Sequence, residues 1–252
     1  MSTAQKLVLI TGGNQGIGFE TAKNLLLTSP EYHIILRCRD PTKGEAAVKE
    51  LQSVPDLKGS VSATQLDVTD DQSVDAAATR LAGEFGKLDI LINNAGIVSL
   101  ESPPTREALR KVLDVNIVGT LSVTEAFLDL LRKATHMPPR IIFVTSSMGS
   151  IQHAANPSSP YYNPQGMEYR TSKAALNMMM VMYYARLKPE GFFVSGVDPG
   201  LCATNFTGNA ESLKARGAAL PADGGDRVAR VAKGERDEDI GKVLSGDSVL
   251  PF

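Results

Sequence analysis

The sequence is poor in the residues that build disulfide-linked or metal-held scaffolds. Its 252 residues contain no tryptophan and only two cysteines, Cys38 and Cys202. Two cysteines exclude a disulfide framework and a cysteine-rich zinc cluster. The three histidines, His33, His136 and His153, show no metal-ligand spacing. We therefore expect neither a bound metal nor a small disulfide-rich secreted fold.

An excess of one charge and long apolar runs are also absent. The 26 basic and 28 acidic residues leave a net charge of −2, which gives no broad basic surface for nucleic acid or an anionic membrane. No uninterrupted apolar run approaches the ~18 residues that a transmembrane helix needs. The N-terminus has no signal-peptide pattern, and the C-terminus matches no address tag. We therefore expect a cytoplasmic protein without nucleic-acid or membrane partners.

The sequence does contain a regular alternation of apolar strands and helical segments. Strands are expected at residues 6–11, 33–36, 61–68, 88–93, 141–145 and 193–197, with a short last strand at 243–244. Helices are expected at residues 17–27, 41–51, 70–85, 105–133, 168–187 and 221–231. Strands separated by helices pair in parallel through right-handed crossovers. The expected fold class is α/β: a Rossmann-type, doubly wound parallel sheet with helices on both faces, in a single domain over residues 1–252.

A glycine-rich turn separates the first strand from the first helix. Residues 11–18 have the sequence Thr-Gly-Gly-Asn-Gln-Gly-Ile-Gly. Glycines let the backbone approach a pyrophosphate closely, and the N-terminus of the following helix offers free N–H groups and a partial positive charge. A strand before the turn and a helix after it favour nucleotide binding over a bare structural turn. We therefore predict cofactor contacts from Gly12, Asn14, Gln15, Gly16, Ile17 and Gly18.

Further motifs follow the later strands in a fixed order. They are Asp67-Val68, Asn93 to Gly96, Asn116, Thr145 to Gly149, Tyr169-x-x-x-Lys173, and Pro199-Gly200 with Thr204. This ordered set, together with the T-G-x-x-x-G-x-G spacing of the glycine turn, resembles the classical short-chain dehydrogenase/reductase family and its carbonyl-reductase-like branch. The resemblance covers about residues 6–205. It implies an NAD(P)H-dependent oxidoreductase that transfers a hydride between its cofactor and a small carbonyl or alcohol substrate.

The pair Tyr169 and Lys173 suits proton transfer to a carbonyl oxygen. Tyrosine can serve as the proton donor only if its pKa of about 10 is brought toward neutral. A nearby lysine favours the phenolate, and two residues four apart share one face of a helix. A hydroxyl from a neighbouring strand end can hold the substrate oxygen. We therefore predict that Tyr169 donates the proton and that Lys173 assists it.

The resemblance implies the roles of the remaining site residues. Fitting the family's S-S-x-x-G pattern to Gly149 makes Ser146 the catalytic serine, with Ser147 as the alternative. Asn116 would hold a water that relays protons to Lys173, and Lys173 would also bond the nicotinamide ribose. Cofactor contacts are implied for Asp67, Val68, Asn94, Ala95, Gly96, Tyr169, Lys173, Pro199, Gly200 and Thr204.

The end of the second strand bears on the choice of cofactor. An acid there binds the ribose 2′-hydroxyl of NAD, whereas an arginine favours the 2′-phosphate of NADP. Residues 36–40 are Leu-Arg-Cys-Arg-Asp, and Asp40 lies beside Pro41, where it suits the N-cap of the next helix. The segment resembles the A-R-D stretch of carbonyl reductases, which implies that Arg39 binds the phosphate and that Arg37 lies within reach. We therefore expect NADP(H) rather than NAD(H).

Two irregular stretches are expected to shape the substrate site. The interval from the catalytic serine to the tyrosine is longer than in the family pattern, so residues 150–167 form an insertion beside the active site. Its three prolines predict a stiff loop rather than a helix, from which Tyr161 and Tyr162 could contact the substrate. Residues 202–220 are small and polar and are expected to form a mobile substrate lid.

Helix 168–187 is apolar nearly all round, which predicts that both of its faces are covered. One face must meet the sheet. The other could meet either the neighbouring long helix or a second subunit, in which case a homodimer would form through helices 105–133 and 168–187.

Two other functions fit parts of the pattern. A non-catalytic NADP(H)-binding sensor would need the glycine turn but no proton donor. The intact set of Asn116, Ser146, Tyr169 and Lys173 argues against that function. An enzyme that uses its cofactor as a scaffold for a non-redox reaction would keep the whole site.

Overall fold

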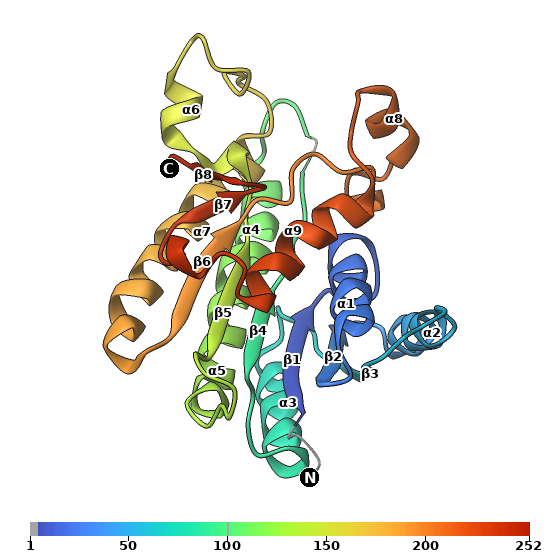
Figure 1. Cartoon of the computed structure of the whole chain (residues 1–252). Helices are drawn as coiled ribbons and strands as arrows, with labels where there is room; N and C mark the ends of the chain where they lie inside the picture. Colours follow the sequence, from blue (N-terminus) through green and yellow to red (C-terminus); the bar gives the residue numbers. More distant parts are fainter. Residues whose placement is uncertain (1–4, 100) are drawn as a thin grey trace.

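The computed structural model describes residues 5–99 and 101–252, and these build one eight-stranded sheet (Figure 1). Its strand order is β3-β2-β1-β4-β5-β6-β7-β8. The strands are β1 Lys6–Thr11, β2 Tyr32–Cys38, β3 Ser60–Gln65, β4 Ile90–Asn93, β5 Arg140–Val144, β6 Phe193–Val197, β7 Val243–Ser245 and β8 Ser248–Leu250. All neighbours pair in parallel except β7 and β8. The expected Rossmann-type fold is therefore confirmed.

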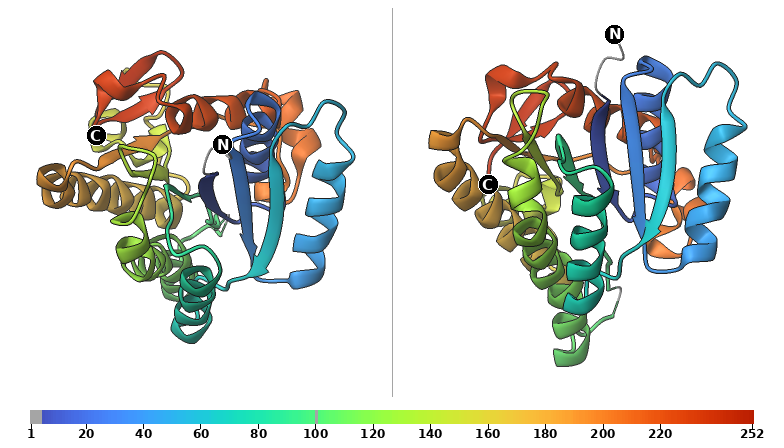
Figure 2. Two further views of the ribbon diagram at one scale, coloured as in Figure 1. Left: turned by 60° about the horizontal axis from the view of Figure 1, so that its bottom comes forward. Right: turned by 90° about the horizontal axis from the view of Figure 1, so that it is seen from below.

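Helices cover both faces of the sheet (Figure 2). They are α1 Gly16–Thr28, α2 Pro41–Gln52, α3 Asp71–Glu84, α4 Arg106–Leu113, α5 Thr120–Leu131, α6 Ile151–Ala155, α7 Met167–Leu187, α8 Ala210–Ala215 and α9 Pro221–Lys233. Leu9 and Ile35 face a core built with α3, α5 and α7, whereas Ile10 and Ile34 face a core built with α1, α2 and α9. Successive strand residues point to opposite faces, so strands that are buried on both faces need near-continuous apolar runs.

Side-chain caps start several helices where the sequence indicates. The carboxylate of Asp40 accepts hydrogen bonds from the backbone N–H groups of Thr42 (2.9 Å) and Lys43 (3.4 Å). This confirms Asp40 as the N-cap of α2. Arg39 and Asp40 are both exposed at the end of β2, but the Asp40 carboxylate is committed to the helix.

The helix expected over residues 105–133 is interrupted. Between α4 and α5 the chain forms a π-helical segment, Asp114–Gly119. At its end, a Cβ on Gly119 would lie 2.6 Å from the carbonyl oxygen of Val68, so only glycine allows this close approach. At its centre, the Asn116 side chain bonds the loop after β4 rather than solvent. Such π-bulges are frequent at functional sites.

The expected boundaries of several other segments also differ from the structure. The insertion (residues 150–167) begins with the short helix α6, which Ser150 caps by accepting from the backbone N–H of His153 (3.1 Å); its prolines follow α6 and leave only the remainder irregular. The lid segment (residues 202–220) contains the short helix α8, and its mobility stays a prediction. The third strand ends at Gln65, and the chain adds β8 after the expected last strand.

The fold brings the carboxyl ends of the central strands to one edge. There α6 and α8 stand at the same end of the molecule, at the top of Figure 1. The strand order reverses between β1 and β4, and open α/β sheets bind ligands at such a switch point. No helix in the described part of the chain is long and apolar enough to cross a membrane.

Candidate active site

A cleft of about 1020 Å³ follows the carboxyl edge of the sheet from the glycine turn to α7. The structure brings most of the predicted site residues to it. The lining includes Gly12, Asn14, Gln15, Gly16, Ile17, Arg39, Asp67, Val68, Asn94, Ala95, Gly96, Ser146, Tyr169, Lys173, Pro199, Gly200 and Thr204.

The glycine turn fits a bound pyrophosphate. Gly12 and Gly16 have φ of 62° and 57°, a left-handed backbone that favours glycine. The N-cap of α1, Gln15, makes no side-chain hydrogen bond to the helix, so the first N–H groups of α1 are not capped and can bind an anion. Gly18 is not part of the lining; a Cβ there would lie 2.6 Å from the side-chain nitrogen of Asn94. Gly18 therefore lets helix and strand pack closely.

Hydrogen bonds across the switch point fix the floor of the cleft. The hydroxyl of Thr11, at the end of β1, accepts from the backbone N–H groups of Asn94 (3.0 Å) and Ala95 (2.9 Å). The Asn94 side chain donates to the carbonyls of Thr11 (2.8 Å) and Gly12 (3.2 Å). The loop after β4 is thereby tied to the glycine turn, which gives a dinucleotide a preformed surface.

Arg37 and Arg39 lie in different environments. Arg39 is exposed and lines the cleft beside Asp67. Arg37 is 1% exposed, and burial, with the nearby charge of Arg80, lowers the pKa of its guanidinium to about 10. The side chain of Arg37 shares the face of Ile35, toward α3, because β2 continues to Cys38. The expectation that Arg37 reaches the cofactor is therefore not met in this structure.

Tyr169, Lys173 and Ser146 meet at the other end of the cleft. Tyr169 and Lys173 come from adjacent turns of α7, with the lysine Nζ 5.6 Å from the tyrosine ring centroid. Lys173 is 4% exposed and donates to the carbonyl oxygen of Val144 at 2.8 Å. A Cβ on Gly149 would lie 2.6 Å from the Lys173 backbone. The glycine after β5 therefore lets α7 come this close.

Burial dominates the electrostatics of this cluster. It raises the pKa of Tyr169 above its ordinary value, against a hydrogen bond with Ser146 that lowers it, and the charge of Asp198 raises it further. Burial lowers the pKa of Lys173 to about 8, and Asp198 opposes that shift. The lowering of the tyrosine pKa that the sequence predicts from Lys173 is therefore not found in this structure.

The two candidate serines differ in what they contact. The Ser146 hydroxyl accepts from the backbone N–H of Met148 (3.2 Å), and the residue is partly exposed in the cleft that Tyr169 also lines. Ser147 is buried and donates its hydroxyl proton to the carboxylate of Asp198. This commitment leaves Ser146 as the serine that faces a substrate, which favours it as the catalytic serine.

Asn116 does not line the cleft. Its side-chain oxygen accepts from the backbone N–H of Ile97 (2.8 Å), and its nitrogen donates to the carbonyl of Ile97 (3.0 Å) and the hydroxyl of Ser172 (2.9 Å). The side chain thus joins the loop after β4 to α7. The structure supports a positioning role, and the proposed water relay to Lys173 stays a prediction.

The insertion and the lid segment contribute aromatic walls. Phe206 of the lid packs edge-on against Tyr169, with ring centroids 5.8 Å apart. Tyr161 of the insertion lines the cleft, and Arg170 of α7 donates to its carbonyl at 2.8 Å. Tyr162, by contrast, is 57% exposed. Only one of the two tyrosines expected at the substrate is therefore brought to the cleft.

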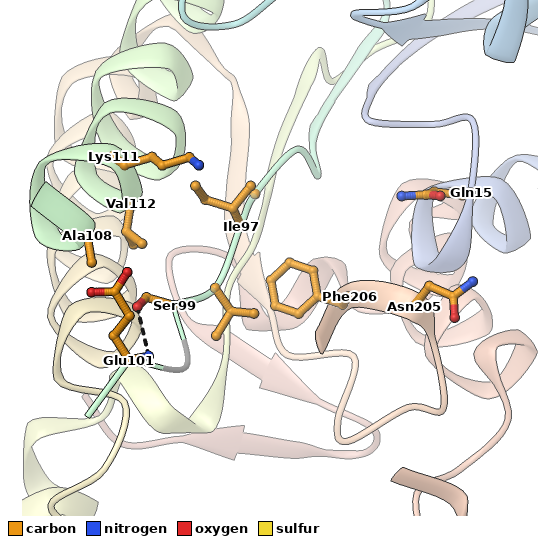
Figure 3. A pocket seen from close by; sticks show the side chains of 11 residues that line it. Gln15, Ile97, Ser99, Glu101, Ala108, Lys111, Val112, Asn205 and Phe206 are labelled. Carbon is orange, nitrogen blue, oxygen red and sulfur yellow. Dashed lines mark hydrogen bonds between the residues drawn. The ribbon is translucent and has the colours of Figure 1, made fainter. Parts of the chain in front are cut away.

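A side pocket of about 450 Å³ opens between the loop after β4, α4 and the lid segment (Figure 3). Its apolar wall includes Ile97, Val112 and Phe206, while Lys111 and Glu101 stand on its α4 side. The sequence did not predict this pocket. The only signal was the helical spacing of Ala108, Lys111 and Val112, which also fits an ordinary amphipathic helix.

Asp198 is another site residue that the sequence did not predict. It follows β6, directly before the predicted Pro199-Gly200 motif, and it lines the cleft with Lys173. An acid at a strand end beside two motif residues was a signal that could have identified it. In the described ranges, no group of three or more histidine, cysteine, aspartate or glutamate residues could hold a metal ion.

Comparison with known proteins gives a consistent family. The family model described as short chain dehydrogenase matches residues 6–215. The short-chain dehydrogenase/reductase tropE of Talaromyces stipitatus is 38% identical over 98% of both chains. The short-chain dehydrogenase anuI of Penicillium roqueforti is 37% identical over 99% of this chain and 97% of its own.

A solved structure extends the likeness to the fold. An NADPH-bound carbonyl reductase from chicken fatty liver has a TM-score of 0.84 and 27% identity, with 100% of this chain and 96% of that chain covered. The glycine turn, the tyrosine–lysine pair and the sheet order fit the same family. The chain therefore belongs to the classical short-chain dehydrogenase/reductase family of NAD(P)H-dependent oxidoreductases.

Proposed function

We propose that this protein reduces a ketone or aldehyde to an alcohol with NADPH, or catalyses the reverse reaction. The observation that carries the proposal is the cluster of Ser146, Tyr169 and Lys173 at one end of a cleft that has Arg39 at its other end. We further propose that residues 1–252 act as one catalytic domain, with the insertion and the lid segment as parts of its substrate site.

The chemistry follows from the positions of the side chains. The bound nicotinamide supplies or accepts the hydride. Ser146 and Tyr169 both line the cleft, and in this proposal the carbonyl oxygen accepts a hydrogen bond from each hydroxyl. Tyr169 then gives its proton to that oxygen as negative charge develops there. Lys173, held by the carbonyl of Val144, places an ammonium group behind the ring and stabilises the phenolate that remains.

Arg39 supports the choice of NADPH over NADH. Its guanidinium is exposed at the end of β2 and lines the cleft near Asp67, where the ribose of a dinucleotide lies in this fold class. A 2′-phosphate there would form a charge-assisted hydrogen bond with arginine. The NADPH bound to the structurally similar carbonyl reductase agrees with this proposal.

Aromatic and apolar walls favour a ring-bearing or branched carbonyl substrate. Phe206 and Tyr161 border the space in front of Tyr169, and the side pocket adds Ile97 and Val112. Such surfaces stabilise a flat apolar group by burying its area.

One assay separates the proposed function from its two alternatives. The protein is mixed with NADPH and a panel of aliphatic and aromatic ketones and aldehydes, and the absorbance of reduced nicotinamide is followed. The proposal predicts substrate-dependent loss of that absorbance with one alcohol formed per NADPH consumed. NADPH binding with no turnover on any carbonyl would favour a sensor. Conversion of a substrate without NADPH consumption would favour a non-redox enzyme.

A further inference from the structure

Asp198 is a buried carboxylate held by hydrogen bonds alone. It is 3% exposed and accepts from the hydroxyl of Ser147, the backbone N–H of Gly200 (2.9 Å) and the hydroxyl of Ser245 (3.4 Å). It forms no ion pair with any basic side chain in the described part of the chain. Burying a charge costs free energy unless a partner compensates it. We therefore asked what the Asp198 carboxylate does next to the reacting groups.

The sheet places this carboxylate beside the tyrosine–lysine pair. Strands β5 and β6 are neighbours, and Val144 pairs with Val197, the residue before Asp198. Lys173 donates to the carbonyl of Val144, so its ammonium lies at the same strand ends as the carboxylate. Asp198, Tyr169 and Lys173 all line the same end of the cleft.

The charge of Asp198 acts on both members of the pair in the same direction. It raises the pKa of Tyr169, in addition to the larger effect of burial. It also raises the pKa of Lys173, against the larger lowering by burial. A negative charge at this point therefore favours the protonated form of each group.

Three arginines lie near the pair or line the same cleft, and none of them is a cause of the pKa shifts of Tyr169 or Lys173. Arg170 of α7 donates to the carbonyls of Tyr161 and Asn163. Arg227 of α9 donates to the carbonyl of Pro199 at 3.0 Å. Arg216 lines the cleft from the lid segment. Asp198 is the one charged group that acts on both Tyr169 and Lys173 in the structure as described.

We propose that Asp198 is a positioning residue of the active site, the fixed counter-charge that Ser147 anchors behind the tyrosine–lysine pair. It keeps the pair in the state that delivers a proton to a carbonyl. It also raises the pH at which Tyr169 forms the phenolate that alcohol oxidation requires. The inference rests on the proposed function, because it assigns Asp198 a part in that same proton transfer.

The test compares Asp198→Asn with Ser147→Ala and the parent protein. Asparagine keeps the size and hydrogen-bonding capacity of the side chain but removes its charge. Alanine at 147 removes the anchoring hydroxyl and leaves the charge. For each protein, kcat/KM is measured across the pH range for ketone reduction with NADPH and for oxidation of the product alcohol with NADP⁺.

Loss of the charge should move both pH profiles toward acid. In Asp198→Asn, the alkaline decline of reduction and the onset of oxidation should each shift down by about one pH unit, the size expected when a close charge is removed. In Ser147→Ala, kcat/KM can fall, but the alkaline decline of reduction and the onset of oxidation should occur at the same pH values as in the parent. A merely structural role for Asp198 predicts lower rates with unmoved limbs, and that result would overturn the inference.

A second measurement needs no turnover. Burial lowers the pKa of folded Lys173 to about 8, whereas the unfolded value is about 10.4, so the unfolded chain binds more protons between these values and stability rises with pH there. Without the charge of Asp198 the pKa of folded Lys173 should be lower still, so in Asp198→Asn the increase of stability with pH should begin at a lower pH. The gap in melting temperature between parent and Asp198→Asn should therefore narrow as pH rises toward about 8. The gap between parent and Ser147→Ala should stay constant.

The two measurements separate the two proposals. If the parent protein reduces no carbonyl, the proposed function fails. The melting temperatures measured across the pH range still test whether Asp198 acts as the counter-charge. If reduction occurs but neither the pH limbs nor the melting gap responds to Asp198→Asn, the counter-charge is contradicted and the proposed function stands.

Discussion

At the scale of single residues, burial decides which of two neighbouring arginines is available to a ligand. Arg37 is enclosed on the face of β2 that α3 covers, and its Nε and one terminal nitrogen are without hydrogen-bond partners in the described structure. Arg39 lies beyond the last residue of β2, where the strand alternation no longer applies, and it is exposed in the cleft. Only Arg39 is therefore in a position to recognise a phosphate.

Replacement of Arg39 by aspartate should shift the preference from NADPH toward NADH. The change removes a charge-assisted hydrogen bond to the 2′-phosphate and adds repulsion. The ratio of kcat/KM for NADPH to that for NADH should fall by at least about tenfold, since hydrogen bonds to charged groups contribute about 1.5–3 kcal/mol. Lys43→Asp, the same charge change at an exposed position of α2, is the matched control. An unchanged ratio in Arg39→Asp would mean that Arg39 does not contact the cofactor.

At the scale of elements, the insertion acts through one of its two adjacent tyrosines. Arg170 ties the carbonyls of Tyr161 and Asn163 to α7, and the Tyr161 ring packs on His153 of α6 at 5.3 Å between centroids. The segment after α6 is thereby held against the helix that carries the catalytic tyrosine. Its far side, with Tyr162, faces away from the cleft.

The substitution Tyr161→Ala should change substrate selectivity without loss of cofactor binding. Removing the ring widens the space in front of Tyr169, so the ratio of kcat/KM for a small ketone to that for a bulky one should fall several-fold. NADPH affinity, measured by fluorescence titration, should stay within a few-fold, because the glycine turn lies at the other end of the cleft. Tyr162→Ala should leave both quantities near the parent values. A collapse of NADPH binding in Tyr161→Ala would show that the insertion supports the nucleotide instead.

The elements also show where sequence reasoning succeeds and where it stops. The glycine turn and the Tyr169–Lys173 pair were predictable because their spacing alone sets their geometry on a turn and on a helix. The break at Asn116 was not, because it depends on a contact with Ile97 that joins distant parts of the chain. The burial of Arg37 likewise depends on α3 packing over β2. Both features depend on tertiary contacts, which a local sequence pattern does not specify.

At the scale of the whole molecule, two helices of the described chain carry exposed apolar side chains. Leu121 of α5 and Met178 and Met182 of α7 are 45%, 63% and 61% exposed, although the opposite faces of both helices pack into the core. Exposed apolar side chains grouped on two helices are typical of subunit contacts. The homodimer expected from the sequence would use this surface.

Met178→Arg should therefore favour the monomer. A buried arginine without a partner is costly in a subunit interface, so the mass measured by light scattering at micromolar concentration should fall from twice the chain mass to the chain mass of 26.9 kDa. The control is Met137→Arg, at a methionine that is 68% exposed in the connection between α5 and β5. A parent protein that is already monomeric at that concentration would contradict the homodimer.

The account as a whole depends on proton delivery by Tyr169, and one measurement tests it most directly. The variant Tyr169→Phe keeps the ring against Phe206 but has no proton to give, whereas Tyr162→Phe makes the same change at an exposed position. General acid catalysis is typically worth about 10²–10⁴-fold, so ketone reduction by Tyr169→Phe should have kcat lower by that factor, with NADPH affinity within a few-fold of the parent and Tyr162→Phe fully active. A Tyr169→Phe protein that binds NADPH and keeps kcat within a few-fold of the parent would contradict the account.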